Sequence, residues 1–247
     1  LMSASASSGA RAAGRKRQKP VSPSVEHDDD QVLAKRRRKP LPDEAKEAGN
    51  SSAPLPTRAD NGDLVFADKP KFRPNLTPKE VLQRGSFGGG YFRPIQSGVL
   101  GKRLAGDWRE LPKDWLDGMD AKTMLSSSAY RPEVNKFGVK CGQSLEQWES
   151  SGWIVPQDPR GWFQWYCRFF QGRRTEDDDR QISRWFGIAG PKGRWKRTLI
   201  RKCIQAGREH DDANVSPVIR QTLQHWAYEL TKPHYDEYAR ELRRRGD

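Results

Sequence analysis

The chain has 247 residues and a net charge of +13, with 45 Lys and Arg residues against 32 Asp and Glu. Residues 1–63 contain none of its 24 aromatic residues and are rich in Ser, Ala, Pro and charge. Such a composition buries too little apolar surface to offset the entropy of ordering. We therefore expect a disordered basic tail over 1–63 and one folded domain over 64–247, with an irregular part (64–142) and a helical part (143–247).

Three cysteines, at 141, 167 and 203, are widely spaced and form no Cys-x-x-Cys pair. This spacing argues against a disulfide framework and against a zinc site, and no other pattern calls for a metal or a cofactor. No stretch approaches the roughly 18 uninterrupted apolar residues of a membrane helix, so we expect no membrane partner.

The positive charge is not confined to the tail. Residues 1–63 hold 12 basic and 9 acidic groups, so most of the net charge of +13 belongs to the predicted domain. A basic folded domain favours a polyanionic partner, and nucleic acid is the commonest one.

Two basic clusters in the tail are typical of nuclear localisation signals. A mitochondrial transit peptide is the alternative, because no acidic residue precedes Glu26. Against that alternative, the second cluster follows the acidic run 28–30. A solvated charge run is a further interpretation of both clusters, and we favour nuclear import. The cluster residues are Arg15, Lys16, Arg17, Lys19, Lys35, Arg36, Arg37, Arg38 and Lys39.

Helix signals begin at Thr77, where Pro78 and Glu80 complete a capping box, and this first helix should end at Gly85. From 91 to 139 the pattern is irregular and predicts loops with two or three short strands. Beyond residue 143, caps and breakers predict an all-α half. Its expected helices begin at Ser144, Asp158, Thr175, the turn 190–193, Ser216 and Thr231, and four of them end near Gly172, Gly187, Ala206 and Leu230.

An aromatic helix is expected over 159–171. Trp162, Trp165, Tyr166, Phe169 and Phe170 recur at core spacing on one wide face. Exposed rings could stack on bases, but this spacing is more typical of a core, so we interpret the helix as the central pillar of the domain.

A basic helix pair follows. From 180 to 208 the chain has nine Lys or Arg residues and no acid, and a turn at 190–193 separates two amphipathic segments. The second segment should turn Trp195, Leu199, Cys203 and Ile204 inward. A helix, a Gly-containing turn and a basic helix are typical of a helix-turn-helix. The predicted phosphate-contacting residues are Arg180, Arg184, Lys192, Arg194, Lys196, Arg197, Arg201 and Lys202.

Other candidates for chemistry are weaker. The acids 176–179 could bind a metal, yet they lie in the first turn of a predicted helix, where acids meet the helix dipole favourably. The run 86–90 lacks the Lys-Ser/Thr of a phosphate loop, so a turn with close backbone approach is the better interpretation. His210, His225 and His234 have no metal-ligand spacing, and His210, beside Asp211 and Asp212, is only a weak candidate for acid–base work.

Two motifs, SFGGGYFRPI from Ser86 and DPRGWFQWYCRFFQGRR from Asp158, resemble a family of eukaryotic proteins without an assigned activity. The similarity extends over about 70–235 and implies no site or reaction.

The sequence therefore predicts a mainly α protein that acts as a non-catalytic nuclear nucleic-acid-binding or chromatin-associated module. Two alternatives stay open: a protein-interaction domain that binds an acidic partner, and a nucleic-acid-modifying enzyme with an active site built from the acids 177–179, arginines and a histidine.

Overall fold

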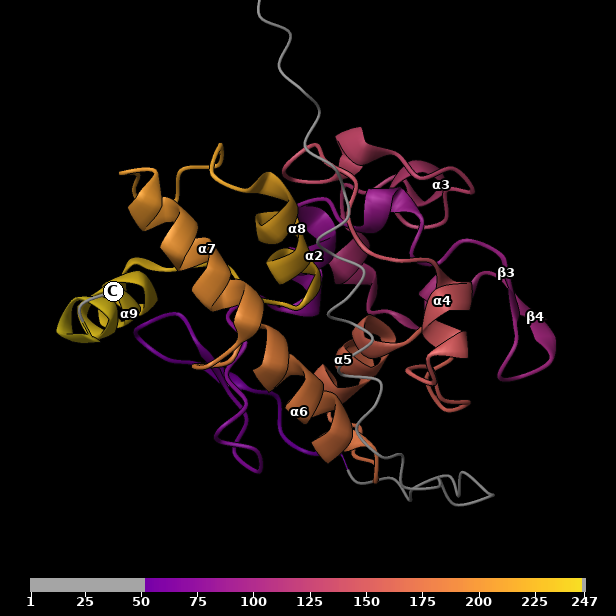
Figure 1. Ribbon diagram of the computed structural model, residues 1–247. Coiled ribbons are helices and arrows are strands. Elements are labelled where there is room, and N and C mark those ends of the chain that lie inside the picture. Colours follow the sequence, from indigo (N-terminus) through magenta and orange to yellow (C-terminus); the bar gives the residue numbers. More distant parts are fainter. Residues whose placement is uncertain (1–51, 246–247) are drawn as a thin grey trace, which may run out of the picture. The chain divides into compact units, whose positions relative to one another are not determined.

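Helices dominate the computed structural model, which describes residues 52–245. The prediction of a mainly α fold with short strands in the first half is thus confirmed (Figure 1). Two antiparallel hairpins pair β1 (Thr57–Arg58) with β2 (Leu64–Val65) and β3 (Ile95–Ser97) with β4 (Lys102–Leu104). The helices are α2 (Pro78–Gln83), α3 (Ala121–Met124), α4 (Leu145–Ser150), α5 (Trp162–Phe170), α6 (Asp178–Ile188), α7 (Arg194–Gln205), α8 (Pro217–His225) and α9 (Lys232–Arg245).

The folded part begins before residue 64. Arg58 of β1 donates to Glu80 of α2 at 2.7 Å and to the carbonyl of Asn75 at 3.0 Å. The amide of Ala53 donates to the carbonyl of Gly172 at 3.0 Å. Residues 53–63 are therefore held by backbone pairing and by one arginine, which corrects the predicted boundary at 63. Both predicted nuclear localisation clusters lie outside the described residues.

Local capping explains where two short helices start. The Thr77 hydroxyl accepts from the amide of Glu80, whose carboxylate accepts from the amide of Thr77. Ser144 and Gln147 make the same reciprocal pair at the start of α4. Both capping boxes follow from residues three apart, and both predicted starts are confirmed.

Helix α5 is the central pillar of the core, as its aromatic spacing predicted. Trp165, Tyr166 and Phe169 are fully buried, and Phe66 and Phe72 from the first hairpin region pack their rings against this cluster. The helix begins at Trp162, later than the predicted Asp158. Arg160 and Gln164 lie opposite the aromatic stripe in sequence, yet they are also buried, at 3% and 1% exposed.

Helix α8 also differs from its predicted bounds. Helix α8 ends at His225, well before the predicted Leu230. The chain turns there, because Trp226 caps the helix and Ala227 has a φ of 54°, in the left-handed region. The amides of Asn75 and Leu76 both donate to the Ala227 carbonyl, so this turn is fixed by the first half of the domain.

Candidate nucleic-acid interface

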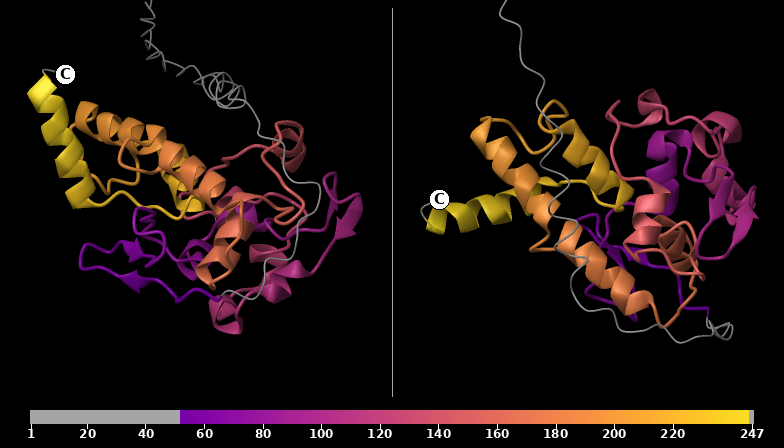
Figure 2. Two further views of the ribbon diagram at one scale, coloured as in Figure 1. Left: turned by 90° about the horizontal axis from the view of Figure 1, so that it is seen from below. Right: turned by 45° about the vertical axis from the view of Figure 1, so that its right-hand side comes forward.

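The predicted basic helix pair exists, but its geometry is not that of a helix-turn-helix. Helices α6 and α7 lie nearly end to end in Figure 1 and in both views of Figure 2. In a helix-turn-helix the second helix crosses the first at a steep angle and enters a groove. The turn between them is tight, since a Cβ on Gly193 would lie 2.5 Å from the Ile188 carbonyl oxygen. The helix-turn-helix prediction was therefore wrong, and α7 continues the line of α6.

Helix α7 is also rotated relative to its predicted inward face. The buried positions are Lys196, Leu199, Ile200 and Cys203, whereas the predicted core residue Ile204 is 39% exposed. Helix α7 packs against both α8 and α9 (Figure 1). Its buried face is set by these two neighbours, and the apolar pattern of α7 alone is consistent with either rotation.

The rotation leaves four of the predicted cations in water. Lys192, Arg194, Arg201 and Lys202 are exposed, and together they form what we call the α7 surface. The guanidinium group of Arg194 lies 5.3 Å from the centre of the Trp195 ring. Within residues 52–245, no carboxylate lies within ion-pair distance of Lys192, Arg201 or Lys202. Three cations near the same helix thus keep their charge available to an external anion.

Lys196 does not belong to this surface. The residue is only 6% exposed, and its ammonium group lies 5.2 Å from the centre of the Tyr228 ring. Burial lowers the pKa of Lys196 to about 8, an effect that the nearby acids Glu237 and Asp63 partly oppose. A buried ammonium cannot reach a phosphate, so the predicted role of Lys196 is corrected.

The remaining predicted cations are engaged by the domain itself. Arg180 donates to Asp177 at 2.7 Å. Arg184 donates to Gln181 at 2.9 Å, with its guanidinium 4.5 Å from the Trp153 ring centre. Arg197 is half-buried and contacts α9, as described below. These three side chains stabilise the ends and flanks of α6 and α7, so they are weaker candidates for phosphate contact.

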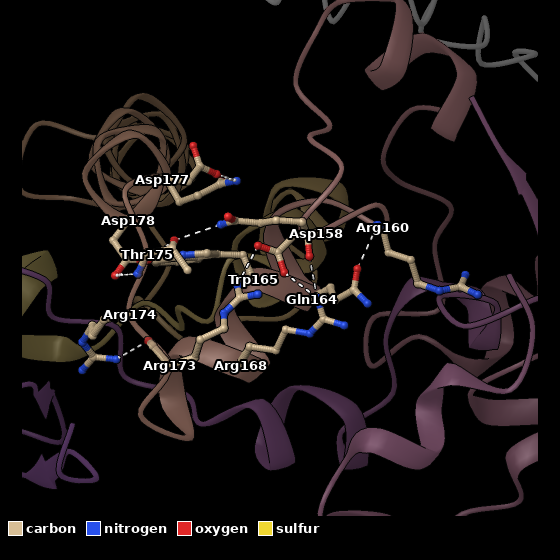
Figure 3. A network of polar contacts seen from close by, with 12 residues as sticks. Asp158, Arg160, Gln164, Trp165, Arg168, Arg173, Arg174, Thr175, Asp177 and Asp178 are labelled. Carbon is tan, nitrogen blue, oxygen red and sulfur yellow. Dashed lines mark hydrogen bonds and ion pairs between the residues drawn. The ribbon is translucent and has the colours of Figure 1, made fainter. Parts of the chain in front are cut away.

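The arginines around α5 pair with carboxylates of the same domain, as Figure 3 shows for Arg168 and Arg173. The carboxylate of Asp158 is fully buried and accepts from Arg168 at 2.9 Å and from Arg173 at 2.6 Å. Arg174 pairs with Asp68 at 2.6 Å. The motif from Asp158 to Arg174 is thus an internal salt-bridge network around α5, and its charge is neutralised inside the domain.

The acids considered as metal ligands serve structural roles at the start of α6. Asp178 accepts from the Thr175 amide at 3.0 Å and from the Trp165 indole nitrogen at 2.9 Å. Asp177 accepts from Arg180 and from Gln181, the latter at 2.9 Å. The Asp179 carboxylate forms an ion pair with the ammonium group of Lys69 at 2.7 Å and is largely exposed. The three carboxylates therefore engage different partners. Within residues 52–245, no group of three His, Cys, Asp or Glu side chains could hold a metal ion.

The glycine run 86–90 binds its own domain through its backbone amides. The Phe87 amide donates to His225 at 2.9 Å, and the Gly88 amide donates to Asn135 at 2.8 Å. The next two amides donate to carbonyls within the turn. None of these donors points to an open anion site, which supports the prediction of a turn with close backbone approach.

A cysteine and a histidine meet beside this turn. Cys141 Sγ lies 3.3 Å from His225 Nδ1. Because His225 Nε2 accepts from the Phe87 amide, the proton of the neutral ring lies on Nδ1 and points to the sulfur. Burial lowers the pKa of His225 to about 3, so the ring is neutral at pH 7. With that proton on Nδ1, His225 cannot accept a proton from the thiol, and the pair lacks the base that an activated cysteine needs.

One set of cations was missed by the sequence reasoning. Arg240, Arg243, Arg244 and Arg245 of α9 are all exposed. The run of three arginines at 243–245, in the last turn of a predicted helix, was the available signal. No helix within the described part of the chain is long and apolar enough to cross a membrane.

Comparisons with protein-family models, with curated proteins and with solved structures find no match for this chain. The argument about function therefore depends on the geometry and charge of the domain.

Proposed function

We propose that this protein is a non-catalytic nuclear module that binds nucleic acid, or nucleic acid within chromatin, through phosphate contacts made by the α7 surface. The observation that carries the proposal is the contrast between two classes of cation. The arginines around α5 are matched to carboxylates, whereas Lys192, Arg201 and Lys202 are exposed and have no carboxylate partner among residues 52–245.

The arrangement of the α7 surface suits a phosphate backbone. Arg194 and Arg201 are seven residues apart, which is about 10 Å along a helix. A nucleic-acid strand carries one phosphate per roughly 3.4 Å of duplex axis, so flexible Lys and Arg side chains on such a helix can each reach one. Contacts of this kind position the protein without reading bases. We therefore expect affinity to depend steeply on salt and weakly on sequence.

Nuclear location is part of the same proposal. It is supported by the two basic clusters in 1–51, which have the composition of import signals. A fluorescent fusion of the full chain should accumulate in nuclei, and replacing Lys35–Lys39 and Arg15–Lys19 with alanines at the basic positions should abolish that accumulation. Mitochondrial accumulation of the unchanged chain would contradict the proposal.

The direct test measures binding of the full chain to labelled nucleic acid over a salt series. The double variant Arg201→Glu/Lys202→Glu should lose at least about tenfold in affinity, and its salt slope should decrease by about 0.9 for each phosphate that the protein no longer neutralises. The matched control is Lys102→Glu/Arg103→Glu, which reverses two exposed charges on β4. Arg197 is a poor choice for this test, because Glu at 197 would face Glu241 and disturb the packing of α9.

Two other outcomes would contradict the proposal. Equal losses in the α7 variant and the β4 control would indicate a general charge effect and would contradict a specific surface. If no nucleic acid binds at low salt, the α7 surface instead fits an acidic protein, and an acidic polypeptide should then bind with the same dependence on Arg201 and Lys202.

A further inference from the structure

Tyr238 of α9 packs against two arginines of the basic helix α7. Its ring is 5% exposed and belongs to the buried face of α9, together with Ala239 and Leu242. The guanidinium group of Arg197 lies 4.7 Å from the ring centre, and that of Arg201 lies 5.7 Å from it. Both distances are within the range at which a cation is attracted to the face of an aromatic ring. One buried ring therefore contacts a guanidinium group of the α7 surface.

The two arginines differ in what else they contact. The Arg197 side chain is 22% exposed and pairs with Glu241 of α9 at 3.5 Å. Arg201 is exposed, and within residues 52–245 no carboxylate lies within ion-pair distance of it. A carboxylate would neutralise the guanidinium charge, whereas an aromatic ring has no net charge and attracts the cation through its quadrupole. Arg201 is therefore restrained by the fold with its positive charge intact.

Such a restraint favours phosphate binding. A free arginine on a helix surface samples many rotamers and loses that freedom when it contacts a ligand. A guanidinium group that already contacts a ring loses less, and its planar set of N–H donors matches the oxygens of a phosphate. The next residue, Lys202, is also exposed, but within the described part of the chain it lies over no aromatic ring. These two neighbouring cations of the α7 surface thus differ in how ordered they are before binding.

We propose that Tyr238 is a positioning residue for phosphate binding: its ring orders the guanidinium group of Arg201, so that this arginine contributes more to affinity than an unrestrained cation. This inference rests on the proposed function and gives α9 a part in it, although the ring itself contacts no phosphate. Arg197 supports the arrangement, because it lies closer to the same ring and also pairs with Glu241 of α9. Both contacts keep α9 against α7 at the position of Arg201.

A double-mutant cycle tests the coupling between Tyr238 and Arg201. The full chain and the variants Tyr238→Leu, Arg201→Gln and Tyr238→Leu/Arg201→Gln are titrated over a salt series. The probes are labelled DNA and RNA of one sequence, single- and double-stranded, and the cycle uses the probe that the unchanged chain binds most tightly. With Arg201 present, Tyr238→Leu should weaken binding about three- to fivefold. In the Arg201→Gln background it should change affinity less than about twofold, because the side chain that the ring orders is absent.

The salt dependence distinguishes lost positioning from lost charge. Arg201→Gln removes a phosphate contact and should lower the salt slope by about 0.9. Tyr238→Leu leaves the charge of Arg201 in place, so it should lower affinity without changing the slope. Tyr238→Phe keeps the ring and removes a buried hydroxyl that has no hydrogen-bond partner within residues 52–245, so it should bind like the unchanged chain.

Two controls use the same helices. Tyr235→Leu makes the same change three residues earlier on α9, where the ring neighbours His210, with the ring centres 6.4 Å apart. It should leave affinity within about twofold of the unchanged chain, and a cycle of Tyr238→Leu with Lys202→Gln should be additive. Circular dichroism and thermal unfolding of each variant check that α9 stays folded.

NMR relaxation of the unchanged chain gives a measurement that needs no variant. The Nε–H group of Arg201 should have a higher order parameter than that of Arg243, an exposed arginine of α9 that lies over no ring within residues 52–245. The inference is overturned if Tyr238→Leu binds like the unchanged chain, if it weakens binding equally with and without Arg201, or if the Arg201 side chain is as mobile as that of Arg243.

Failure of this inference can be told apart from failure of the proposed function. If binding depends on Arg201 and Lys202 but the cycle shows no coupling between Arg201 and Tyr238, only the positioning role is lost. If the Arg201→Glu/Lys202→Glu variant binds as well as the unchanged chain, the proposed function itself is contradicted.

Discussion

The ammonium group of Lys196 lies over the ring of Tyr228, 5.2 Å from its centre, although Lys196 belongs to the most basic helix of the chain. The cation therefore faces the packed interior, with its aliphatic stem among apolar neighbours. Lys202 is six residues further along the same helix and is exposed. These two lysines differ in exposure and share a helix, which makes them a matched pair.

Lys196→Met should leave nucleic-acid affinity and its salt dependence unchanged, because the buried ammonium makes no phosphate contact. Stability should be maintained or increased, since methionine fills similar space without the cost of burying a charge. Lys202→Met should weaken binding and lower the salt slope by about 0.9. Salt-dependent binding assays and urea unfolding of both variants check this prediction. Equal loss of affinity in the two variants would contradict it.

The sequence predicted those features that depend on residues close together in the chain. The capping boxes at Thr77–Glu80 and Ser144–Gln147 need only their own side chains and amides, so their positions could be predicted. The aromatic helix α5 was predictable because its core spacing persists over two turns. The predicted start at Asp158 was wrong because that carboxylate bonds Arg168 and Arg173, 10 and 15 residues further along the chain, instead of capping the helix.

Features that depend on distant packing could not be predicted in this way. The stripe of Trp195, Leu199 and Cys203 and that of Lys196, Leu199 and Cys203 differ by one residue, and only the positions of α8 and α9 decide between them. The β1–β2 hairpin has little apolar content, so its sequence resembles a tail. Its pairing is fixed by backbone hydrogen bonds and by Arg58, whose partner Glu80 lies 22 residues away.

Asp158→Asn should strongly destabilise the domain. The fully buried carboxylate bridges Arg168 and Arg173, and a neutral amide would leave Arg173 without its counter-charge and Arg168 with Glu110 alone. Because both arginines are partly solvated, we expect the lower end of the usual cost, about 3 kcal/mol. Asp114→Asn is the control, since its ion pair with Lys79 is exposed and worth less than about 1 kcal/mol. Urea unfolding of the two variants measures the difference, and equal losses would contradict the structural role of Asp158.

His225 should make the protein less stable as the pH falls below 6.5. Burial lowers its pKa to about 3 from an ordinary value of 6.5, so the unfolded chain takes up a proton that the folded protein does not. The contribution of His225 to the free energy of unfolding is fully present well above pH 6.5. Below pH 6.5 it decreases by up to about 1.4 kcal/mol per pH unit. His234, whose pKa burial also lowers, acts in the same direction.

The variant His225→Gln isolates this contribution, because glutamine can still accept a hydrogen bond but does not titrate. The slope of its unfolding free energy between pH 6.5 and 5 should be smaller than that of the unchanged chain. Arginine and lysine partners lower the pKa of Asp68 and Glu229, so these two carboxylates stay ionised across this window. Identical slopes for the two proteins would show that His225 does not titrate on unfolding.

Alanine substitutions at Gly89 and Gly118 distinguish the energetic cost of backbone strain from that of steric overlap. Their φ angles are +74° and +75°, so alanine at either position carries the same conformational cost, about 1 kcal/mol. A Cβ at Gly118 meets nothing within 4 Å, whereas one at Gly89 would lie 1.9 Å from the backbone oxygen of Thr123. Gly118→Ala should therefore cost about 1 kcal/mol, and Gly89→Ala should cost roughly 1–3 kcal/mol more, because a backbone carbonyl must move. Thermal and urea unfolding of the two variants give the comparison. Equal losses would show that the turn at 86–90 can shift away from α3, and that its glycines serve only the left-handed backbone and not the close contact with Thr123.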